Sequence, residues 1–344
     1  MPAIADYNLV TLRDLFVSWG FPASHAKRLL RHYYDRAGQV DFSVTSLPLR
    51  VAERLRQEMP AFSGNIARQQ TSDDQTTKLL LQFPDGAQVE SVLMPDHRPD
   101  RAAGCLSSQV GCAMACDFCA TGGQGFTRDL TAGEIIEQFL RLKHAAAQLD
   151  RRLHTVVFMG MGEPLANLDN VLSAIRLIAQ DATGHLGWRQ ITLSTVGLVP
   201  QMHQLIHAGL SIQLAISLHA PDDALRARLI PSASRYPISE ILDAASLYQT
   251  TLGRVAIIQY CLLDGVNDSP DHARQLAALL HHRHMHVNLL TYNPTGQPYN
   301  PTPPERVAQF LMTLRDQGIV AHLRRSRGKD IAAACGQLRQ REGE

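Results

Sequence analysis

One stretch decides the fold of this 344-residue chain: Cys112-Ala-Met-Ala-Cys116-Asp-Phe-Cys119, which runs directly into Ala120-Thr121-Gly122-Gly123. Three thiolates on one short loop suit a metal cluster better than a single ion, because a structural zinc site takes four ligands. The loop therefore favours a metal cluster and leaves a fourth coordination position open. The alternatives are a zinc site completed by Cys105, an electron-transfer ferredoxin, which would normally supply four cysteines, and incidental thiols.

The C-x3-C-x2-C spacing resembles that of radical S-adenosylmethionine (SAM) enzymes. In those enzymes three cysteines hold a four-iron, four-sulfur cluster, and the amino and carboxylate groups of SAM chelate the one iron that is left open. The resemblance therefore implies SAM as a second cofactor.

Composition restricts the class of protein. Hydrophobic residues make up 45% of the chain, and no run reaches the roughly 18 apolar residues that a membrane span requires. Residues 1–6 contain neither a basic nor an apolar segment, so we expect no secretion signal, no membrane partner and a cytoplasmic protein. Four of the six cysteines fall within residues 105–119, which in a reducing compartment favours metal or redox chemistry over a disulfide scaffold.

Charge is balanced overall but clustered locally. With 33 Lys and Arg against 32 Asp and Glu, the net charge does not favour a nucleic-acid partner. Two local clusters of basic residues do favour such a partner, because nucleic-acid phosphates are bound by local positive patches. The alternative is that these clusters are ordinary solvent-exposed surfaces. They are Lys27, Arg28, Arg31, His32 and Arg36 in one predicted helix, and Arg324, Arg325, Arg327 and Lys329 near the C-terminus.

The chain is expected to form three parts. Residues 1–75 read as a small helical, RNA-binding module, with helices over 8–36, interrupted at Gly20-Phe-Pro22, and over 49–59. Apolar runs at 78–83 and 89–94 flank Pro84-Asp85-Gly86, which predicts a β-hairpin extension over 76–100. Residues 101–344 form the third part, which ends in a loop that carries Cys335.

Strands and helices alternate from residue 101 onward. Strands are expected at 155–160, 190–195, 212–217, 254–262, 286–291 and 319–323, and helices at 131–149, 168–178, 199–207, 224–229, 239–252, 272–282 and 304–317. This alternation predicts an α/β fold with a closed or partly closed parallel barrel. The resemblance to radical SAM enzymes implies a partial parallel (β/α)6 barrel of their type. Such barrels carry their functional residues at the C-terminal ends of the strands.

Polar residues follow several of these strands. In Gly160-Met-Gly162-Glu163-Pro164 we expect the glycines to admit a ligand and Glu163 to accept from an ammonium group. A dinucleotide-binding loop is the alternative, but its third glycine is absent. The other strand-end residues, suited to hydrogen-bond a ribose or an amino-acid group, are Ser194, Ser217, Leu218, His219 and Asn293.

Taken in order, these motifs resemble the RlmN/Cfr family of RNA methyltransferases. The resemblance covers about residues 90–338. It rests on Cys105-Leu-Ser-Ser-Gln-Val-Gly-Cys112, the triad through Gly122, Phe158-Met-Gly-Met-Gly-Glu-Pro164, Leu193-Ser-Thr195, Ile216-Ser-Leu-His219, Gly265-Val-Asn-Asp268, Asn288-Leu, Asn293-Pro294 and Ala333-Ala-Cys-Gly-Gln-Leu338.

The resemblance implies a role for each candidate residue. The cluster would be held by Cys112, Cys116 and Cys119, and SAM by Gly162, Glu163, Ser194, Ser217, Leu218, His219 and Asn293. Cys335 would carry the methyl group, Cys105 would resolve the covalent intermediate, and Glu90 would accept a proton. As single residues, Cys105 and Cys335 could equally be small buried hydrophobes.

The implied reaction methylates a ring carbon of adenine, which is not nucleophilic enough to take a methyl group from SAM directly. A methylated Cys335 would instead lose hydrogen to a SAM-derived radical, add to the ring, and leave as a Cys105–Cys335 disulfide. We expect C2 methylation of 23S rRNA and also of tRNA, with flavodoxin or ferredoxin as electron donor. The alternatives are C8 methylation, a radical SAM enzyme with a small-molecule substrate, and a zinc-containing RNA-binding module.

Overall fold

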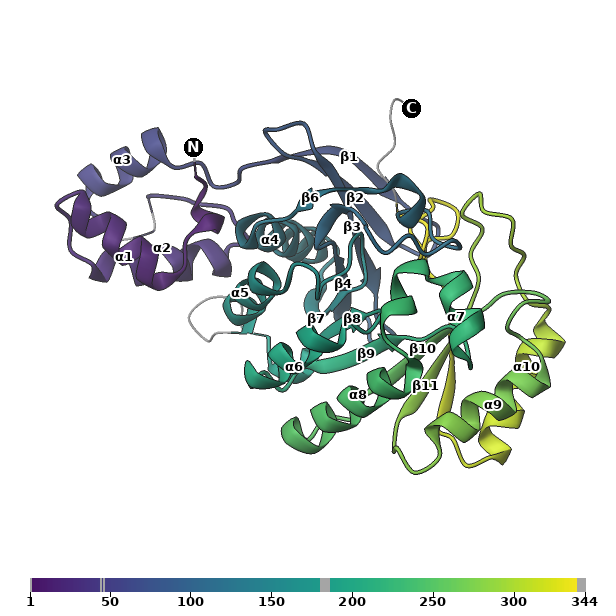
Figure 1. The fold of residues 1–344 in the computed structure, drawn as a ribbon. Helices are drawn as coiled ribbons and strands as arrows, with labels where there is room; N and C mark the ends of the chain where they lie inside the picture. The colour runs from purple at the N-terminus through teal and green to yellow at the C-terminus, as the bar shows by residue number, and fades with distance from the viewer. Residues whose placement is uncertain (1, 44, 46, 180–185, 339–344) are drawn as a thin grey trace.

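A computed structural model of the protein describes residues 2–43, 45, 47–179 and 186–338. Three helices lie at one end of the molecule, and the remainder is built on a ten-stranded sheet (Figure 1). The strand order is β1-β2-β3-β4-β7-β8-β9-β10-β11-β12, which follows the sequence except for the separate pair β5–β6. No helix in these ranges combines the length and the apolar character needed to cross a membrane.

The N-terminal helices lie where the periodicity predicts them: α1 (Leu9–Ser18), α2 (Ser24–Asp35) and α3 (Leu49–Glu58), after a short 3-10 turn η1 (Ile4–Asp6). The Asn8 side chain caps α1 by accepting from the amides of Val10 and Thr11 at 2.8 and 3.0 Å. Buried side chains of all three helices belong to the main core, among them Leu12, Phe16, Leu29, Tyr33, Val51 and Leu55.

Three antiparallel strands form one edge of the sheet: β1 (Asn65–Thr71), β2 (Thr77–Gln82) and β3 (Gln88–Pro95). β2 and β3 pair as the expected hairpin. The expectation of helical structure up to residue 75 is wrong for β1, which pairs with β2. Its residues are almost all exposed, so the strand lacks the apolar alternation by which strands are recognised in a sequence.

The other seven strands of this sheet run parallel: β4 (Arg101–Leu106), β7 (Arg152–Phe158), β8 (Ile191–Thr195), β9 (Gln213–Ser217), β10 (Ile257–Leu262), β11 (His286–Thr291) and β12 (Ala321–Arg324). Their helices are α4 (Ala132–Gln148), α5 (Leu168–Ala179), α6 (Val199–His207), α7 (Asp223–Leu229), α8 (Ile238–Leu252), α9 (Pro270–Leu280) and α10 (Pro304–Asp316). In the described sheet β1 and β12 are the two edges, so the barrel is partial, as predicted.

The first strand-to-helix connection holds an insertion that the sequence did not predict. β5 (Gln109–Gly111) and β6 (Phe126–Asp129) form a two-stranded sheet between β4 and α4. The cysteine stretch lies between these two short strands. The remaining short turns are η2 (Gly122–Gln124), η3 (Trp188–Gln190) and η4 (Pro231–Arg235).

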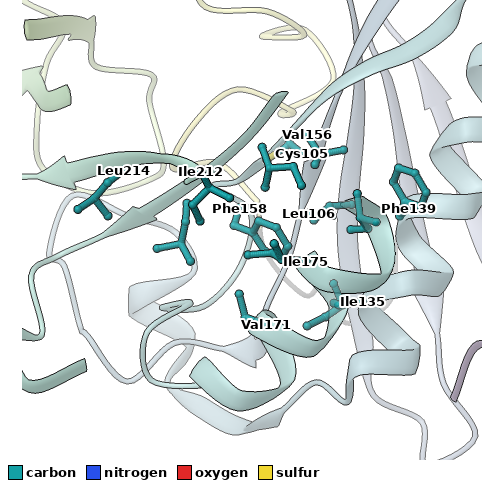
Figure 2. Packing of buried hydrophobic residues seen from close by; sticks show 14 of the residues in the cluster. Cys105, Leu106, Ile135, Phe139, Val156, Phe158, Val171, Ile175, Ile212 and Leu214 are labelled. Atoms are coloured by element: carbon teal, nitrogen blue, oxygen red, sulfur yellow. The ribbon is translucent and has the colours of Figure 1, made fainter. Parts of the chain in front are cut away.

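Alternate residues of β4 and β7 face opposite sides of the sheet. Val156 and Phe158 pack with Ile135 and Phe139 of α4 in the hydrophobic core (Figure 2). A Cβ on Gly104 would lie 3.1 Å from Cδ1 of Leu142, also on α4. Cys105 of β4 and Val157 of β7, whose sequence neighbours face α4, therefore face away from it, toward what we call the inner face.

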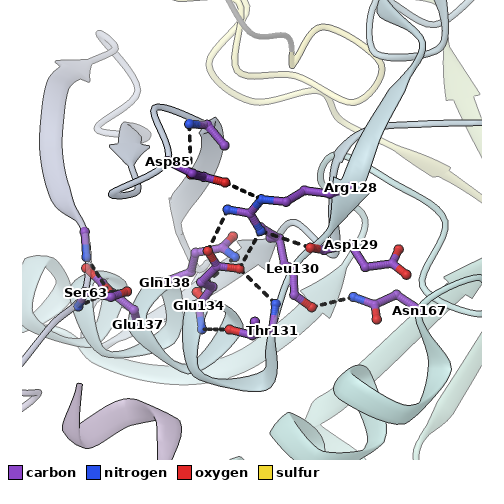
Figure 3. A network of polar contacts seen from close by, with 12 residues as sticks. Ser63, Asp85, Arg128, Asp129, Leu130, Thr131, Glu134, Glu137, Gln138 and Asn167 are labelled. Carbon is purple, nitrogen blue, oxygen red and sulfur yellow. Dashed lines mark hydrogen bonds and ion pairs between the residues drawn. The ribbon is translucent and has the colours of Figure 1, made fainter. Parts of the chain in front are cut away.

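A polar network fixes the insertion against α4 (Figure 3). Glu134 accepts from the Thr131 amide at 2.8 Å and, through both oxygens, from the Arg128 guanidinium at 2.9 and 2.8 Å. Arg128 also pairs with Asp85 at 2.6 Å, in the turn between β2 and β3. This arginine therefore joins the insertion, the hairpin and α4.

Candidate active site

The clustered cysteines lie on a tightly closed loop. The Cys112 amide donates to the carbonyl oxygen of Gly125 at 2.7 Å. Gly111 has a φ of +75°, and a Cβ there would lie 2.0 Å from that same oxygen. A Cβ on Gly122 would lie 2.7 Å from the carbonyl oxygen of Cys116. The loop closes only because these positions carry no side chain.

Burial controls the protonation of these thiols. It raises the pKa of Cys112 to about 12 and that of Cys116 well above its usual value, and neighbouring thiols and Glu163 raise both further. Such thiols become thiolates only when a bound cation stabilises them. In the described ranges, no three His, Cys, Asp or Glu side chains converge on one metal ion. A cluster, whose ligands bind separate irons, fits this loop better than zinc.

The loop Gly160–Pro164 follows β7 and packs against the insertion. A Cβ on Gly162, whose φ is +95°, would lie 2.5 Å from Cβ of Gln109. One on Gly160 would lie 2.7 Å from the carbonyl oxygen of Leu106. The close approach seen here is to the protein itself and brings Glu163 to the cysteine loop. The expected contact of these glycines with a ligand stays a prediction.

Glu163 is held at the end of β8 by backbone amides. Its Oε1 accepts from Leu165 at 3.0 Å and its Oε2 from Val196 at 2.9 Å. Burial nevertheless raises the pKa of this carboxyl, which is 3% exposed, to about 7. A bound ammonium group would favour the ionised form. The expected role as acceptor for the SAM ammonium fits this environment.

Polar groups gather at the ends of β8 and β9. The hydroxyls of Ser194 and Ser217 lie 3.2 Å apart. Leu218 has a fully buried side chain, and its amide donates to the carbonyl oxygen of Gln259 at 3.1 Å.

His219 is neutral and has one defined tautomer. Its Nδ1 accepts from the Cys261 amide at 2.9 Å, so the proton is on Nε2. Burial, together with the positive charge of Arg226, lowers its pKa to about 3. The ring packs edge-on against Phe118, within the cysteine triad, at a centroid distance of 5.1 Å. The Nε2–H group is thus a hydrogen-bond donor next to the cysteine loop.

Asn293, just after β11, carries an unsatisfied buried oxygen. Its Nδ2 donates to the carbonyl oxygen of Cys335 at 3.3 Å, whereas its Oδ1 has no hydrogen-bond partner in the described structure. A buried amide oxygen without a donor is costly. An ammonium or hydroxyl group of a ligand could satisfy this oxygen.

Cys105 lies on the inner face, in register with residues of the antiparallel strands. Val92 pairs with Cys105 across β3 and β4, and Lys78 pairs with Val92 across β2 and β3. Directly paired residues share a face, and so does Glu90, two residues from Val92. Lys78 Nζ lies 2.8 Å from Glu90 Oε1, in an ion pair whose side chains are 4% and 5% exposed.

Residues 328–338, which we call the Cys335 loop, lie against this ion pair and the cysteine loop. Lys78 Nζ donates to the carbonyl oxygen of Ala332 at 3.2 Å. Ala120, directly after the triad, donates its amide to the carbonyl oxygen of Gly336 at 2.8 Å. In Figure 1 this loop is the yellow segment beside the blue antiparallel strands.

Cys335 and Cys105 are free thiols that interact with each other. Cys105 is 7% exposed, and its pKa is raised by burial and then by the charge of Cys335. Cys335 is exposed to solvent, yet the surrounding protein also raises the pKa of its thiol. Together with the contacts of Lys78 and Ala120, this interaction places the Cys335 loop beside the face of the sheet that carries Cys105.

Sequence analysis missed three residues near this centre. Lys78 interrupts an apolar strand, and that pattern could have identified it. Cys261 in β10 interacts with Cys335 and Cys119, and burial raises its pKa to about 12. Arg226 is 1% exposed, donates to the carbonyl oxygen of Val196, and interacts with Cys116. No motif surrounds these last two residues.

Comparisons with known proteins agree with this geometry. Residues 106–280 match the family model described as the radical SAM superfamily. The crystal structure of a radical SAM methyltransferase from Sphaerobacter thermophilus has a TM-score of 0.94 and 40% sequence identity, and the match covers 98% of this chain and 99% of that one. Fold and cysteine loop define a radical SAM enzyme, which uses a four-iron, four-sulfur cluster and SAM.

Full-length relatives narrow the assignment. A protein of Opitutus terrae named "Probable dual-specificity RNA methyltransferase RlmN 1" is 57% identical, over 100% of this chain and 98% of its own length. A "Probable dual-specificity RNA methyltransferase RlmN" of Symbiobacterium thermophilum is 43% identical, over 97% of this chain and 90% of its own. The chain belongs to the RlmN family of SAM-dependent RNA methyltransferases, which confirms the expectation from the motifs.

Proposed function

We propose that the enzyme methylates C2 of an adenine in 23S rRNA and in tRNA, with Cys335 as methyl carrier. When bound, the cluster and SAM would supply a methyl group and a carbon-centred radical that takes hydrogen from it. The cluster ligands are Cys112, Cys116 and Cys119, and the SAM-binding residues are Gly162, Glu163, Ser194, Ser217, Leu218, His219 and Asn293. The observation that carries the proposal is that the Cys335 loop lies against both the cysteine loop and the inner face of the sheet, which carries Cys105.

Each thiol has its own task. Cys335 carries the carbon that bonds to the adenine ring, which leaves a covalent enzyme–RNA adduct. The adduct must lose one electron, which the bound cluster would accept, and the ring proton, which Cys105 takes and passes to Glu90. The Cys105 thiolate then attacks the sulfur of Cys335, the bond between that sulfur and the transferred carbon breaks, and this carbon takes a proton to complete the methyl group. The methylated base leaves, and a Cys105–Cys335 disulfide remains for an external reductant. Their accessibility suits these roles, because Cys335 is exposed to substrate whereas Cys105 is buried.

Glu90 is proposed as a proton acceptor on the same inner face as Cys105. Its ion pair with Lys78 anchors the carboxylate within the sheet. The position two residues from Val92, which pairs with Cys105, supports this assignment.

The N-terminal module is proposed to bind RNA phosphates. Lys27, Arg28 and Arg31 are exposed on α2 and Arg36 directly after it. Arg324 and Arg325 are exposed before the Cys335 loop, and Lys329 is exposed within it. The basic residues of the N-terminal module lie far from the two thiols, and those by the Cys335 loop lie close to them. Together they would bind phosphates along an extended RNA and so orient it toward the thiols. The dual specificity named for the relatives motivates the choice of both rRNA and tRNA.

The electron donor is proposed to be a flavodoxin or a ferredoxin in the cytoplasm. Residues 123–127 beside the cysteine loop are exposed and include Phe126, which is 47% exposed. An exposed apolar side chain close to the cluster ligands provides a place for a transient redox partner.

Mass spectrometry of nucleosides tests the proposed product. The reconstituted enzyme is incubated with SAM, reductant and either 23S rRNA or tRNA lacking the modification. We expect 2-methyladenosine from both substrates. 8-Methyladenosine would establish the C8 alternative, and no methylated adenosine from either RNA would reject an RNA substrate.

A further inference from the structure

The Cys335 loop is anchored at both ends by different parts of the molecule. At its start, the amide of Gly328 donates to Asp74 at 3.1 Å, and Asp330 accepts from the Ser72 hydroxyl at 2.5 Å. Ser72 and Asp74 lie in the turn between β1 and β2. At its end, the Thr121 hydroxyl donates to the carbonyl oxygen of Leu338 at 2.5 Å. The antiparallel strands hold one end, and the cysteine loop holds the other.

Between these anchors the backbone bends sharply at Ala332. Its φ is +51°, in the left-handed region that a residue with a Cβ seldom adopts. Its carbonyl oxygen accepts from Lys78 Nζ at 3.2 Å, three residues before the proposed methyl carrier. An unfavourable backbone conformation persists only when surrounding contacts hold it. The ammonium of Lys78 is such a contact.

We propose that Lys78 is a positioning residue for Cys335, and that its ammonium fixes the bend at Ala332 so that the Cys335 sulfur meets Cys105 on the inner face. The proposal rests on the role of Cys335 given above. Lysine suits the position because an ammonium has three donors, and here one contacts Glu90 and another the Ala332 carbonyl. Glu90 compensates the buried charge. Register places Lys78 in the same cross-strand row as Cys105, so the sheet itself sets the position of the bend.

Hydrogen exchange of the full-length protein measures whether Lys78 holds the loop. In Lys78→Met, amides of residues 328–338 should exchange about fivefold faster, because a charge-assisted hydrogen bond to the bend is lost. Lys78→Arg should restore slow exchange. Arg141→Met is the matched control, since Arg141 pairs with buried Glu137 at 3.3 Å on α4, and its described contacts do not include the Cys335 loop. Unchanged exchange in a folded Lys78→Met protein would overturn the proposal.

A second variant covers the outcome in which Lys78→Met fails to fold because Glu90 is left buried without its ammonium. Lys78→Met combined with Glu90→Leu removes both charges and leaves only the Ala332 carbonyl without its donor. We expect the same faster exchange over residues 328–338. A loop that exchanges as slowly as in the wild type would refute the positioning role.

Methylation of Cys335 distinguishes positioning from general stability. With cluster and SAM present, Lys78→Met should cleave SAM at a rate similar to the wild type but methylate Cys335 about tenfold more slowly, because the thiol is misplaced. Lys78→Arg should recover methylation. Equal losses of SAM cleavage and methylation would count against positioning. A wild-type protein whose Cys335 peptide gains no methyl group would reject the proposed function itself, whatever the exchange experiment shows.

Discussion

The antiparallel and the parallel parts of the sheet each bury a carboxylate, and they stabilise it in different ways. In the antiparallel part Glu90 is 4% exposed and lies 2.8 Å from the ammonium of Lys78. In the parallel part Glu163 is 3% exposed and accepts from the amides of Leu165 and Val196. The ammonium of Lys78 balances the charge of Glu90. The amides around Glu163 carry no net charge, so a cationic ligand is needed to balance this carboxylate. The antiparallel strands therefore support the site, and the parallel strand ends bind its ligands.

The largest expected effect is the loss of the cluster from the parallel part. Cys112→Ala, Cys116→Ala and Cys119→Ala should each lower iron content and SAM cleavage by about two orders of magnitude, because three ligands leave no redundancy. Iron analysis and 5′-deoxyadenosine measurement would show this. Cys261→Ala is the control, because this neighbouring thiol is not a proposed ligand and should retain its iron. Full iron content in any triad variant would contradict the assignment.

The second largest expected effect distinguishes the roles of Cys105 and Cys335, which lie where the antiparallel and parallel parts of the sheet adjoin. Cys335→Ala should accept no methyl group and form no bond to RNA. Cys105→Ala should accept the methyl group, form the adduct and then stall, so that a protein–RNA conjugate survives denaturation. Denaturing gels with labelled RNA measure both results. A conjugate from Cys335→Ala alone would show that the roles are reversed, and none from either variant would argue against covalent catalysis.

The smallest effect concerns the pH dependence of stability in the iron-free protein. Burial raises the pKa of Glu163 from 4.5 to about 7, so the folded protein retains a proton that the unfolded chain loses. Stability should therefore fall as pH rises from about 4.5 through 7, by up to about 3 kcal/mol. Glu163→Gln should flatten this slope while lowering stability at pH 5, because a hydrogen bond to Leu165 or Val196 is lost.

Urea unfolding of the wild type and Glu163→Gln at pH 5, 6, 7 and 8 would measure this slope. Lys143→Met provides a comparison outside the site, since Lys143 contacts the carbonyl oxygen of Tyr34. Its slope between pH 5 and 7 should resemble that of the wild type. A Glu163→Gln protein with the wild-type slope would mean that another group titrates.

By itself, the sequence determined the features that depend on local spacing. The cysteine loop, the helices and the parallel strands were predictable because periodicity and short motifs reflect the geometry of contiguous residues. Ser194, Ser217 and Asn293 were predictable for a related reason, because parallel strands end at the same edge of a sheet. Even so, β1 was missed, since an exposed edge strand takes its structure from its partner rather than from an apolar pattern of its own.

Only the tertiary structure decided which distant residues meet. Lys78 and Ala332 are 254 positions apart in the chain, and their contact depends on the register of β2 with β3 and on the path of the Cys335 loop. The interaction of Cys261 with Cys335 likewise arises from the order of the parallel strands. No local pattern encodes such contacts, because they form only after strand pairing and packing have closed the long connections between them.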